Sequence, residues 1–237
     1  MNKELENKLK RVNRLGDYYP ILPLNVRIDE IPNRYFSKEH PLFEYNKQLI
    51  NATHTFTSIY SFNLSHYRYK QFEEDLEDTI HYIKTMFSGK LVFLDARAGA
   101  YCQDELECME DELFHRYDCD ILSVTPSYGQ ESVSYFSTLL KDKGFVAVDL
   151  TKLSNANDCL IESVCSDEFE NMMFKYKGDL GGIKLSRAKS YLISDLESYK
   201  GFSKEKLKDF KLFLELPRET VLQKDIYSAM TEIVEAL

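Results

Sequence analysis

Short apolar runs that are typical of buried strands alternate with longer amphipathic segments along most of this chain. Such alternation is characteristic of a parallel sheet, because parallel neighbours are joined by a crossover that is usually a helix. The strand-like runs are Tyr19–Val26, Phe56–Phe62, Leu91–Asp95, Asp120–Thr125, Phe145–Leu150, Leu180–Ile183 and Lys211–Leu216. The sequence therefore predicts a fold built from repeated βα units.

Several of the intervening segments carry apolar residues at helical spacing. In Gln71–Phe87, apolar side chains recur every three or four residues and share one face. The same pattern predicts helices at Gln130–Lys141 and Lys224–Leu237. Asp104–Arg116 is also predicted to be helical, but its run of acidic residues indicates a solvated face rather than a metal site.

Seven or eight βα units favour a closed barrel over an open, dinucleotide-binding sheet. The length of 237 residues is close to the roughly 250 residues of a (β/α)8 barrel, and the sequence has no G-x-G-x-x-G turn. We therefore expect an α/β protein with one TIM-barrel domain over residues 1–237, of which residues 1–18 form an N-terminal helical extension. An eighth strand near the C-terminus is not identified by the pattern, so an incomplete barrel is the alternative.

In such a barrel, the functional residues lie at the carboxyl ends of the strands. Polar residues follow several of the predicted strands, and any of them could line a ligand site. These candidates are Asp29, Ser61, Asn63, Asp95, Arg97, Thr125, Ser127, Thr151 and Arg218. His66 follows the second strand, but we interpret this lone histidine as structural.

The charge balance limits the class of partner. Thirty Lys and Arg against 39 Asp and Glu give a net charge of −9, which argues against a nucleic-acid or anionic-membrane surface. The charged N-terminal residues lack the apolar core of a signal peptide, and no segment approaches the ~20 apolar residues of a membrane span, so we expect a cytoplasmic protein. The five cysteines form no C-x-x-C pair, and neither a metal nor another cofactor is expected.

Two of the strand ends resemble a known family. LVFLDARAGAY, residues 91–101, and DILSVTPSYGQESVSYF, residues 120–136, resemble the third and fourth strands of orotidine 5′-monophosphate decarboxylases, which read D-A-K-R-G-D-I and D-A-V-T-V-N-P-Y-L-G-x-D-S-L-x-P-F. LPLNVRIDEIP, ATHTFTSIYSFNLSHY, GFVAVDLTKLSNANDCL and GDLGGIKLSRA resemble the first, second, fifth and sixth strands in the right order. The resemblance spans roughly residues 20–220 and implies a TIM barrel.

The resemblance also shows where this chain departs from the family. The family's Lys-Asp-Lys-Asp array places carboxylates against the substrate's carboxylate, and a Lys protonates the carbon after carbon dioxide has left. Carried over by position, the array becomes Ser61, Asp95, Arg97 and Ala100, so that only Asp95 is kept. A guanidinium holds its proton with a pKa above about 12 and is a poor general acid. The resemblance further assigns Asp29 to the ribose-binding Asp.

The residues with which the family binds the 5′-phosphate also differ in this chain. The family's seventh strand ends in P-G-x-G-A-Q-G-G, whereas we match that strand to FLELPRETVLQKD, which has Pro217 and no Gly. On this match, the family's eighth strand, with its phosphate-binding Arg, has no clear counterpart. Arg218 is then a candidate for holding an anion in another way.

Three hypotheses follow from these departures. The first is a degenerate barrel that has lost decarboxylation and acts as a binding, scaffold or regulatory subunit, for instance as the dimer partner of an intact paralogue. The second is an active lyase with a site rebuilt around Asp95 and Arg97 and a further residue not recognised in the sequence. The third is a barrel that binds a nucleotide without turning it over. The partners expected are a nucleotide or another small molecule, and a second subunit in a homodimer or heterodimer.

Overall fold

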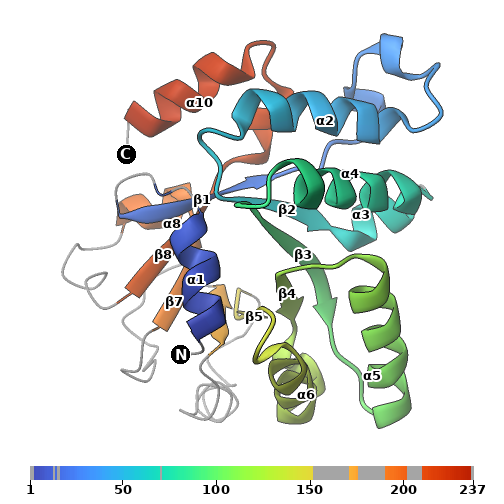
Figure 1. Cartoon of the computed structure of the whole chain (residues 1–237), viewed down its shortest axis with the longest axis vertical. Helices are drawn as coiled ribbons and strands as arrows, with labels where there is room; N and C mark the ends of the chain where they lie inside the picture. The colour runs from blue at the N-terminus through green and yellow to red at the C-terminus, as the bar shows by residue number, and fades with distance from the viewer. Residues whose placement is uncertain are drawn as a thin grey trace.

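The chain folds into a closed barrel of eight parallel strands (Figure 1). The computed structural model describes residues 3–12, 14, 17–69, 71–151, 171–175, 190–201 and 210–235. The strands are β1 Tyr18–Pro23, β2 Ile59–Asn63, β3 Leu91–Ala98, β4 Ile121–Val124, β5 Phe145–Asp149, β6 Met172–Lys175, β7 Ser190–Asp195 and β8 Phe210–Glu215. Each strand pairs with its neighbours in chain order, and β8 closes the ring on β1. The TIM barrel predicted from the sequence is confirmed, and its C-terminal end is complete.

The strand assignment from sequence was wrong in one region. The strand predicted at Leu180–Ile183 falls outside the described residues, and β6 and β7 were both missed. The segment matched to the family's seventh strand is β8, because Phe213 pairs with Tyr19 of β1. β6 has four residues, and strands buried on both faces show no polar alternation, so short runs of this kind give a weak signal.

Apart from α1, which precedes β1, the helices follow strands along the chain and pack on the outside of the barrel. They are α1 Lys3–Arg11, α2 Pro41–Thr53, α3 Leu64–Tyr69, α4 Glu73–Met86, α5 Gln103–Glu110, α6 Gln130–Leu140, α8 Leu196–Gly201 and α10 Ile226–Glu235. The predicted acidic helix is α5 followed by a π-helical stretch, η3 Asp111–Arg116. Short 3-10 turns occur at η1 Ile28–Glu30, η2 Asn33–Tyr35, η4 Pro126–Tyr128 and η7 Arg218–Leu222.

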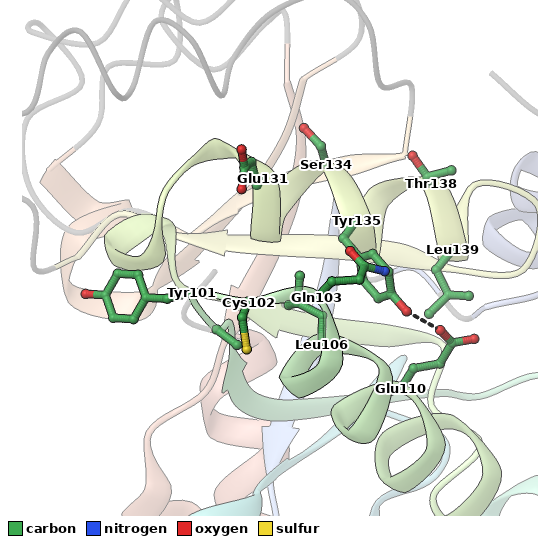
Figure 2. Close-up of a pocket in the computed structure, with 11 residues that line it drawn as sticks. Tyr101, Cys102, Gln103, Leu106, Glu110, Glu131, Ser134, Tyr135, Thr138 and Leu139 are labelled. Carbon is green, nitrogen blue, oxygen red and sulfur yellow. Dashed lines mark hydrogen bonds between the residues drawn. The ribbon is translucent and has the colours of Figure 1, made fainter.

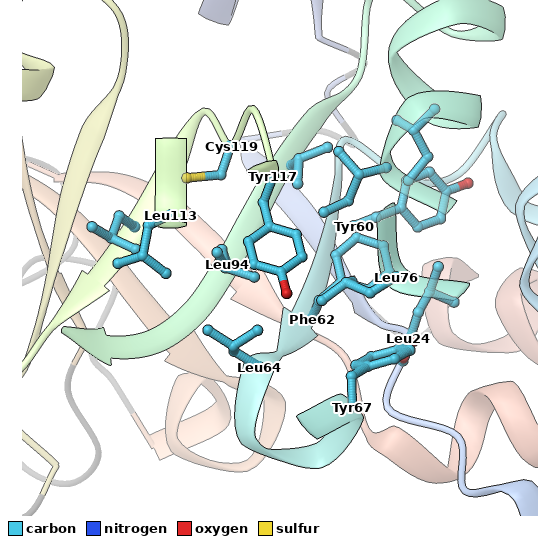
Figure 3. Packing of buried hydrophobic residues seen from close by; sticks show 14 of the residues in the cluster. Leu24, Tyr60, Phe62, Leu64, Tyr67, Leu76, Leu94, Leu113, Tyr117 and Cys119 are labelled. Atoms are coloured by element: carbon cyan, nitrogen blue, oxygen red, sulfur yellow. The ribbon is translucent and has the colours of Figure 1, made fainter. Parts of the chain in front are cut away.

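Alternation along the strands gives the barrel two apolar layers. Tyr60 and Phe62 of β2 point outward and pack with residues of α3 and α4, such as Tyr67 and Leu76 (Figure 3). The intervening positions point inward and build a separate interior cluster. This inner cluster includes Ile59 of β2 and the stacked rings of Tyr19 and Phe213, whose centroids are 4.7 Å apart.

The amino-terminal end of the barrel is covered by α1. Leu9 and Val12 are buried in the interior cluster. Just outside it, Asp120 lies 3.0 Å from Lys8 Nζ and 2.6 Å from Lys84 Nζ, which ties α1 and α4 to the start of β4. Because α1 covers this end, a ligand site in the barrel is expected at the carboxyl ends of the strands.

The structure also bears on membrane-spanning helices and on the cysteines. Within the described ranges, no helix is both long and apolar enough to traverse a bilayer. Cys102, Cys108 and Cys119 have free thiols, whereas Cys159 and Cys165 lie outside the described residues.

Candidate functional site

The carboxyl end of the barrel carries a ring of charged side chains. Phe93, Ala147, Met173 and Phe213 belong to the interior cluster. Two residues further along the same strands, the inward positions are charged, because side chains alternate with a period of two. With Arg97, which follows on β3, these residues form what we call the mouth cluster: Asp95, Arg97, Asp149, Lys175 and Glu215.

Lys175 lies at the end of β6 and is largely buried. Its Nζ lies 3.0 and 3.2 Å from the two carboxylate oxygens of Glu215 on β8, and 5.8 Å from the centre of the Phe93 ring. Burial alone would lower the pKa of Lys175, but the charges of Glu215, Asp95 and Asp149 outweigh it and raise the pKa. Lys175 is therefore an ammonium at neutral pH.

Asp95 is fixed by the neighbouring strand. The hydroxyl of Ser123 on β4 donates to Asp95 Oδ1 at 2.7 Å, and the backbone N–H of Arg97 donates to the same hydroxyl at 2.7 Å. The pairing of β3 with β4 shifts register between Leu94 and Ala98, which marks a bulge. Arg97 lies in this bulge with a φ of 48°, a left-handed conformation that is uncommon for a residue with a side chain.

Arg97 and Asp149 face each other at longer range. Arg97 Nε lies 3.8 Å from Asp149 Oδ2 and 3.9 Å from Asp95 Oδ1. The other oxygen of Asp149 accepts hydrogen bonds from the backbone N–H and the hydroxyl of Thr151, at 3.0 and 2.5 Å. The structure thus brings together Asp95, Arg97 and Thr151 of the sequence candidates.

The two candidates on β2 have different surroundings. Ser61 takes the position that the family resemblance gives to a catalytic Lys, and it is only 2% exposed. Its hydroxyl has no hydrogen-bond partner among the described residues. Asn63, in contrast, accepts a hydrogen bond from the N–H of His66, while its own N–H donates to Asn25 Oδ1. Asn63 therefore caps the amino terminus of α3.

The remaining candidates make local contacts. Asp29 is exposed in η1, and its carboxylate pairs with Arg27, whose Nε lies 2.9 Å from Oδ1. The hydroxyl of Thr125 donates to Ser127 Oγ at 3.1 Å at the start of η4. His66 Nε2 lies 3.0 Å from the carbonyl oxygen of Val26, which supports the structural interpretation of this histidine.

Arg218 follows a different strand from the one predicted, since the match to the family placed it after the seventh strand. It follows β8, so the eighth strand that the match to the family left without a counterpart is present, and Arg218 comes directly after it. In this chain the guanidinium is already engaged. Its Nη2 donates to the carboxylate of Glu30, and its Nε donates to the carbonyl oxygen of Asn25 at 3.0 Å. The hydrogen bond from Arg218 lowers the pKa of Glu30, which is therefore ionised at neutral pH.

The end of β7 also differs from the family's glycine-rich phosphate loop. β7 ends in Asp195 and continues directly into α8, without a glycine between them. Asp195 Oδ1 accepts a hydrogen bond of 2.7 Å from the backbone N–H of Ser198. An acidic side chain of the protein thus accepts a hydrogen bond from a backbone N–H after β7, as Glu30 accepts one from the guanidinium after β8.

A second concave surface lies on the outside of the barrel, between α5 and α6 (Figure 2). This pocket has a volume of about 540 Å³ and is lined by Leu106, Leu139 and Tyr135 among others. The hydroxyl of Tyr135 donates to Glu110 within it. Because it lies between helices, this pocket is separate from the mouth cluster.

Three members of the mouth cluster were missed from the sequence. Asp149 and Glu215 lie inside predicted strands, two positions after buried apolar residues, so the period of two would have placed them on the inner face. Lys175 was missed because its strand was missed. Glu30, the partner of Arg218, carries no sequence signal, since the two residues are 188 positions apart.

Curated relatives of this chain are orotidine 5′-phosphate decarboxylases. The chain is 32% identical over 122 residues to the enzyme of Cellvibrio japonicus, a match that covers 52% of this chain and 44% of that protein. It is 26% identical over 156 residues to the enzyme of Phocaeicola vulgatus, covering 64% of this chain and 57% of that protein. The chain therefore spans about half the length of the curated relatives it matches. No family model matches the chain.

Solved structures with the same fold cover nearly the whole chain. The OMP decarboxylase of Leishmania donovani superimposes with a TM-score of 0.71 at 16% identity, covering 99% of this chain and 96% of that structure. A 3-hexulose-6-phosphate synthase superimposes with a TM-score of 0.60 at 10% identity, covering 92% and 99%. At these identities the likeness concerns the fold.

Proposed function

The chain is a divergent member of the orotidine 5′-monophosphate decarboxylase superfamily, and on this premise we propose that it is a ligand-binding barrel that does not decarboxylate orotidine 5′-phosphate. The observation that carries the proposal is the contact between Arg218 and Glu30. A guanidinium that holds a carboxylate of its own chain is not available to a phosphate dianion, and the same carboxylate repels that dianion. Asp195 at the end of β7 acts in the same direction.

The catalytic positions support the same proposal. Ser61 offers a hydroxyl where the family resemblance expects an ammonium, and Ala100 is a buried apolar residue where it expects a carboxylate. Arg97 keeps a positive charge but is a poor proton donor. Of the four positions, Asp95 alone keeps the side chain that the resemblance expects, and the Ser123 hydroxyl already donates a hydrogen bond to that carboxylate.

A titration with nucleotides tests this proposal. A ligand present at 100 times its dissociation constant stabilises the folded state by about 2.7 kcal/mol, which a thermal melt detects readily. We expect neither uridine 5′-monophosphate nor orotidine 5′-phosphate to raise the melting temperature of this protein at millimolar concentration. The Cellvibrio japonicus relative serves as the positive control. A saturable rise in melting temperature with either nucleotide would contradict the proposal.

A second function is favoured by one observation, the ammonium of Lys175 among three carboxylates. Such an arrangement suits a carbon-carbon lyase acting on a carboxylate without a phosphate. The bond between the carboxylate and its carbon would break, carbon dioxide would leave, and the carbanion would take a proton from Lys175 Nζ, which water then restores. This function predicts release of carbon dioxide from orotate or orotidine that the variant Lys175→Met abolishes. No release from either compound would reject these two as substrates.

A role as a partner subunit remains a prediction from the resemblance, since the family's sites lie across a two-fold dimer. We expect the purified chain to form a homodimer of twice 27.8 kDa or a heterodimer with an intact paralogue. Light scattering after size-exclusion chromatography measures this directly. A monomer that does not combine with such a paralogue would contradict the prediction.

A further inference from the structure

The guanidinium of Arg97 donates no hydrogen bond to a protein acceptor in the part of the chain that the structure describes. Its closest carboxylate oxygens among these residues are 3.8 and 3.9 Å from Nε. Lys175, in contrast, is bound to Glu215 through contacts of 3.0 and 3.2 Å. The side chain of Arg97 is 47% exposed and therefore reachable from solvent at the barrel mouth.

The backbone holds Arg97 in this position at a cost in free energy. The left-handed φ of 48° and the bulge in β3 turn the chain at this residue, and the hydrogen bond from its N–H to Ser123 fixes the turn. A residue with a Cβ is less stable in this conformation than in the right-handed one, because its Cβ lies too close to the carbonyl oxygen that follows. Such strain is retained where the position of a side chain matters.

The hydroxyl of Ser61 also has no hydrogen-bond partner among the described residues. Ser61 is on the inward face of β2, since Ile59 two residues before it belongs to the interior cluster. It pairs in register with Phe93, two positions before Asp95 on β3. A buried hydroxyl without a hydrogen bond destabilises the folded state, and a bound ligand that accepts or donates one removes that cost.

The surroundings of Arg97 select the charge of the ligand. The planar guanidinium matches the two oxygens of a carboxylate through parallel hydrogen bonds. Asp95 and Asp149 flank the same group, so that a phosphate dianion is repelled more strongly than a carboxylate monoanion. We propose that Arg97 binds the carboxylate of a small, phosphate-free ligand at the barrel mouth, and that Ser61 hydrogen-bonds a polar atom of the same ligand. This inference rests on the proposed function.

Calorimetric titration with four probes tests the inference. Orotate, nicotinate and benzoate are planar carboxylates, and uracil is a ring of similar size without a carboxylate. We expect at least one of the three carboxylates to bind, and uracil to bind at least tenfold more weakly or not at all. Arg97→Gln is expected to weaken that binding by about tenfold or more, and Ser61→Ala by a few fold. Arg97→Lys keeps the charge but loses the planar fork, so intermediate binding is expected.

The control variant is Arg116→Gln, which removes an arginine paired with Glu77 on the outside of the barrel and should bind like the wild type. The inference is overturned when none of the three carboxylates binds, or when Arg97→Gln binds them as tightly as Arg116→Gln does. These outcomes leave the proposed function intact, because that function fails on a separate result, the binding of uridine 5′-monophosphate. A thermal melt of each variant confirms that it is folded.

Discussion

Arg218 follows the last strand of the barrel, and its guanidinium is held by the carboxylate of Glu30 on the first loop. Sequence reasoning identified Arg218 as a candidate for anion binding. Its partner could not be identified in the same way, because the pair forms only once the barrel closes. On the proposed function, the charge of Glu30 changes the class of ligand that Arg218 accepts.

Replacing Glu30 should restore the capacity of Arg218 to bind an anion. The variant Glu30→Gln removes the competing charge and keeps the shape of the side chain. We expect it to bind uridine 5′-monophosphate measurably by calorimetry, with an affinity at least several fold above that of the wild type. The exposed Glu39→Gln changes the net charge equally and serves as the control. Equal binding by the two variants would show that Glu30 does not block the site.

Lys90 predicts a pH dependence of stability. It lies at the start of β3, is 8% exposed, and donates to the carbonyl oxygen of Thr57. Burial lowers the pKa of Lys90 to about 8 from its usual 10.5. Between these values the unfolded chain binds more protons than the folded one, so the contribution of Lys90 to stability improves as pH rises from 8 to 10.5.

The variant Lys90→Met removes this contribution. At pH 7 the variant should be more stable than the wild type, or should lose less free energy of unfolding than a methionine substitution normally costs. Its free energy of unfolding relative to the wild type should fall as the pH rises to 10. Urea denaturation at pH 7, 8, 9 and 10 measures the difference. Lys38→Met, at an exposed position, should show a difference that is constant with pH. A constant difference for Lys90→Met would contradict the assigned pKa.

At the scale of the element, β3 combines a regular strand with a bulge that carries the arginine. Leu91 to Leu94 are buried and pair regularly, and the register shifts after Leu94. The bulge is what separates Asp95, which is held by Ser123, from Arg97, whose donors are accessible. Neither the bulge nor the positive φ could be inferred from the residue types, since arginine has no preference for this conformation.

Two substitutions at Arg97 measure the backbone strain directly. Because glycine adopts a φ of 48° without a steric penalty, Arg97→Gly should be more stable than Arg97→Ala by about 1 kcal/mol in urea denaturation. The opposite order is expected at Glu105 in α5, where Glu105→Ala should be more stable than Glu105→Gly by about 1 kcal/mol. The same order at both positions would mean that Arg97 is unstrained.

Elements differed in how well the sequence predicted them. Runs such as Phe145–Leu150 are long enough to be identified by apolar content, and the helical faces of α4 and α6 were identified by their period. β6 has only three buried residues before Lys175. Because β6 was not identified, the last strand was matched to the family's seventh strand instead of its eighth. For the same reason Lys175 was not recognised as a member of the mouth cluster.

At the scale of the whole molecule, the two ends of the barrel have opposite character. The amino end is closed by α1 and by the contacts of Asp120 with two lysines. The carboxyl end carries charged and polar side chains from β2, β3, β5, β6 and β8. Parallel strands make this separation unavoidable, because all their carboxyl ends point the same way. The sequence alone predicted a candidate site at this end, and the closed barrel supplied the charged residues that face each other across it.

The proposal that this barrel does not decarboxylate orotidine 5′-phosphate can be checked with carboxyl-labelled substrate. The labelled carbon dioxide released by the purified chain is measured beside that released by the Cellvibrio japonicus relative. We expect the chain to release no more carbon dioxide than buffer alone. Release by the wild type that Asp95→Ala abolishes would show that the barrel is an active decarboxylase.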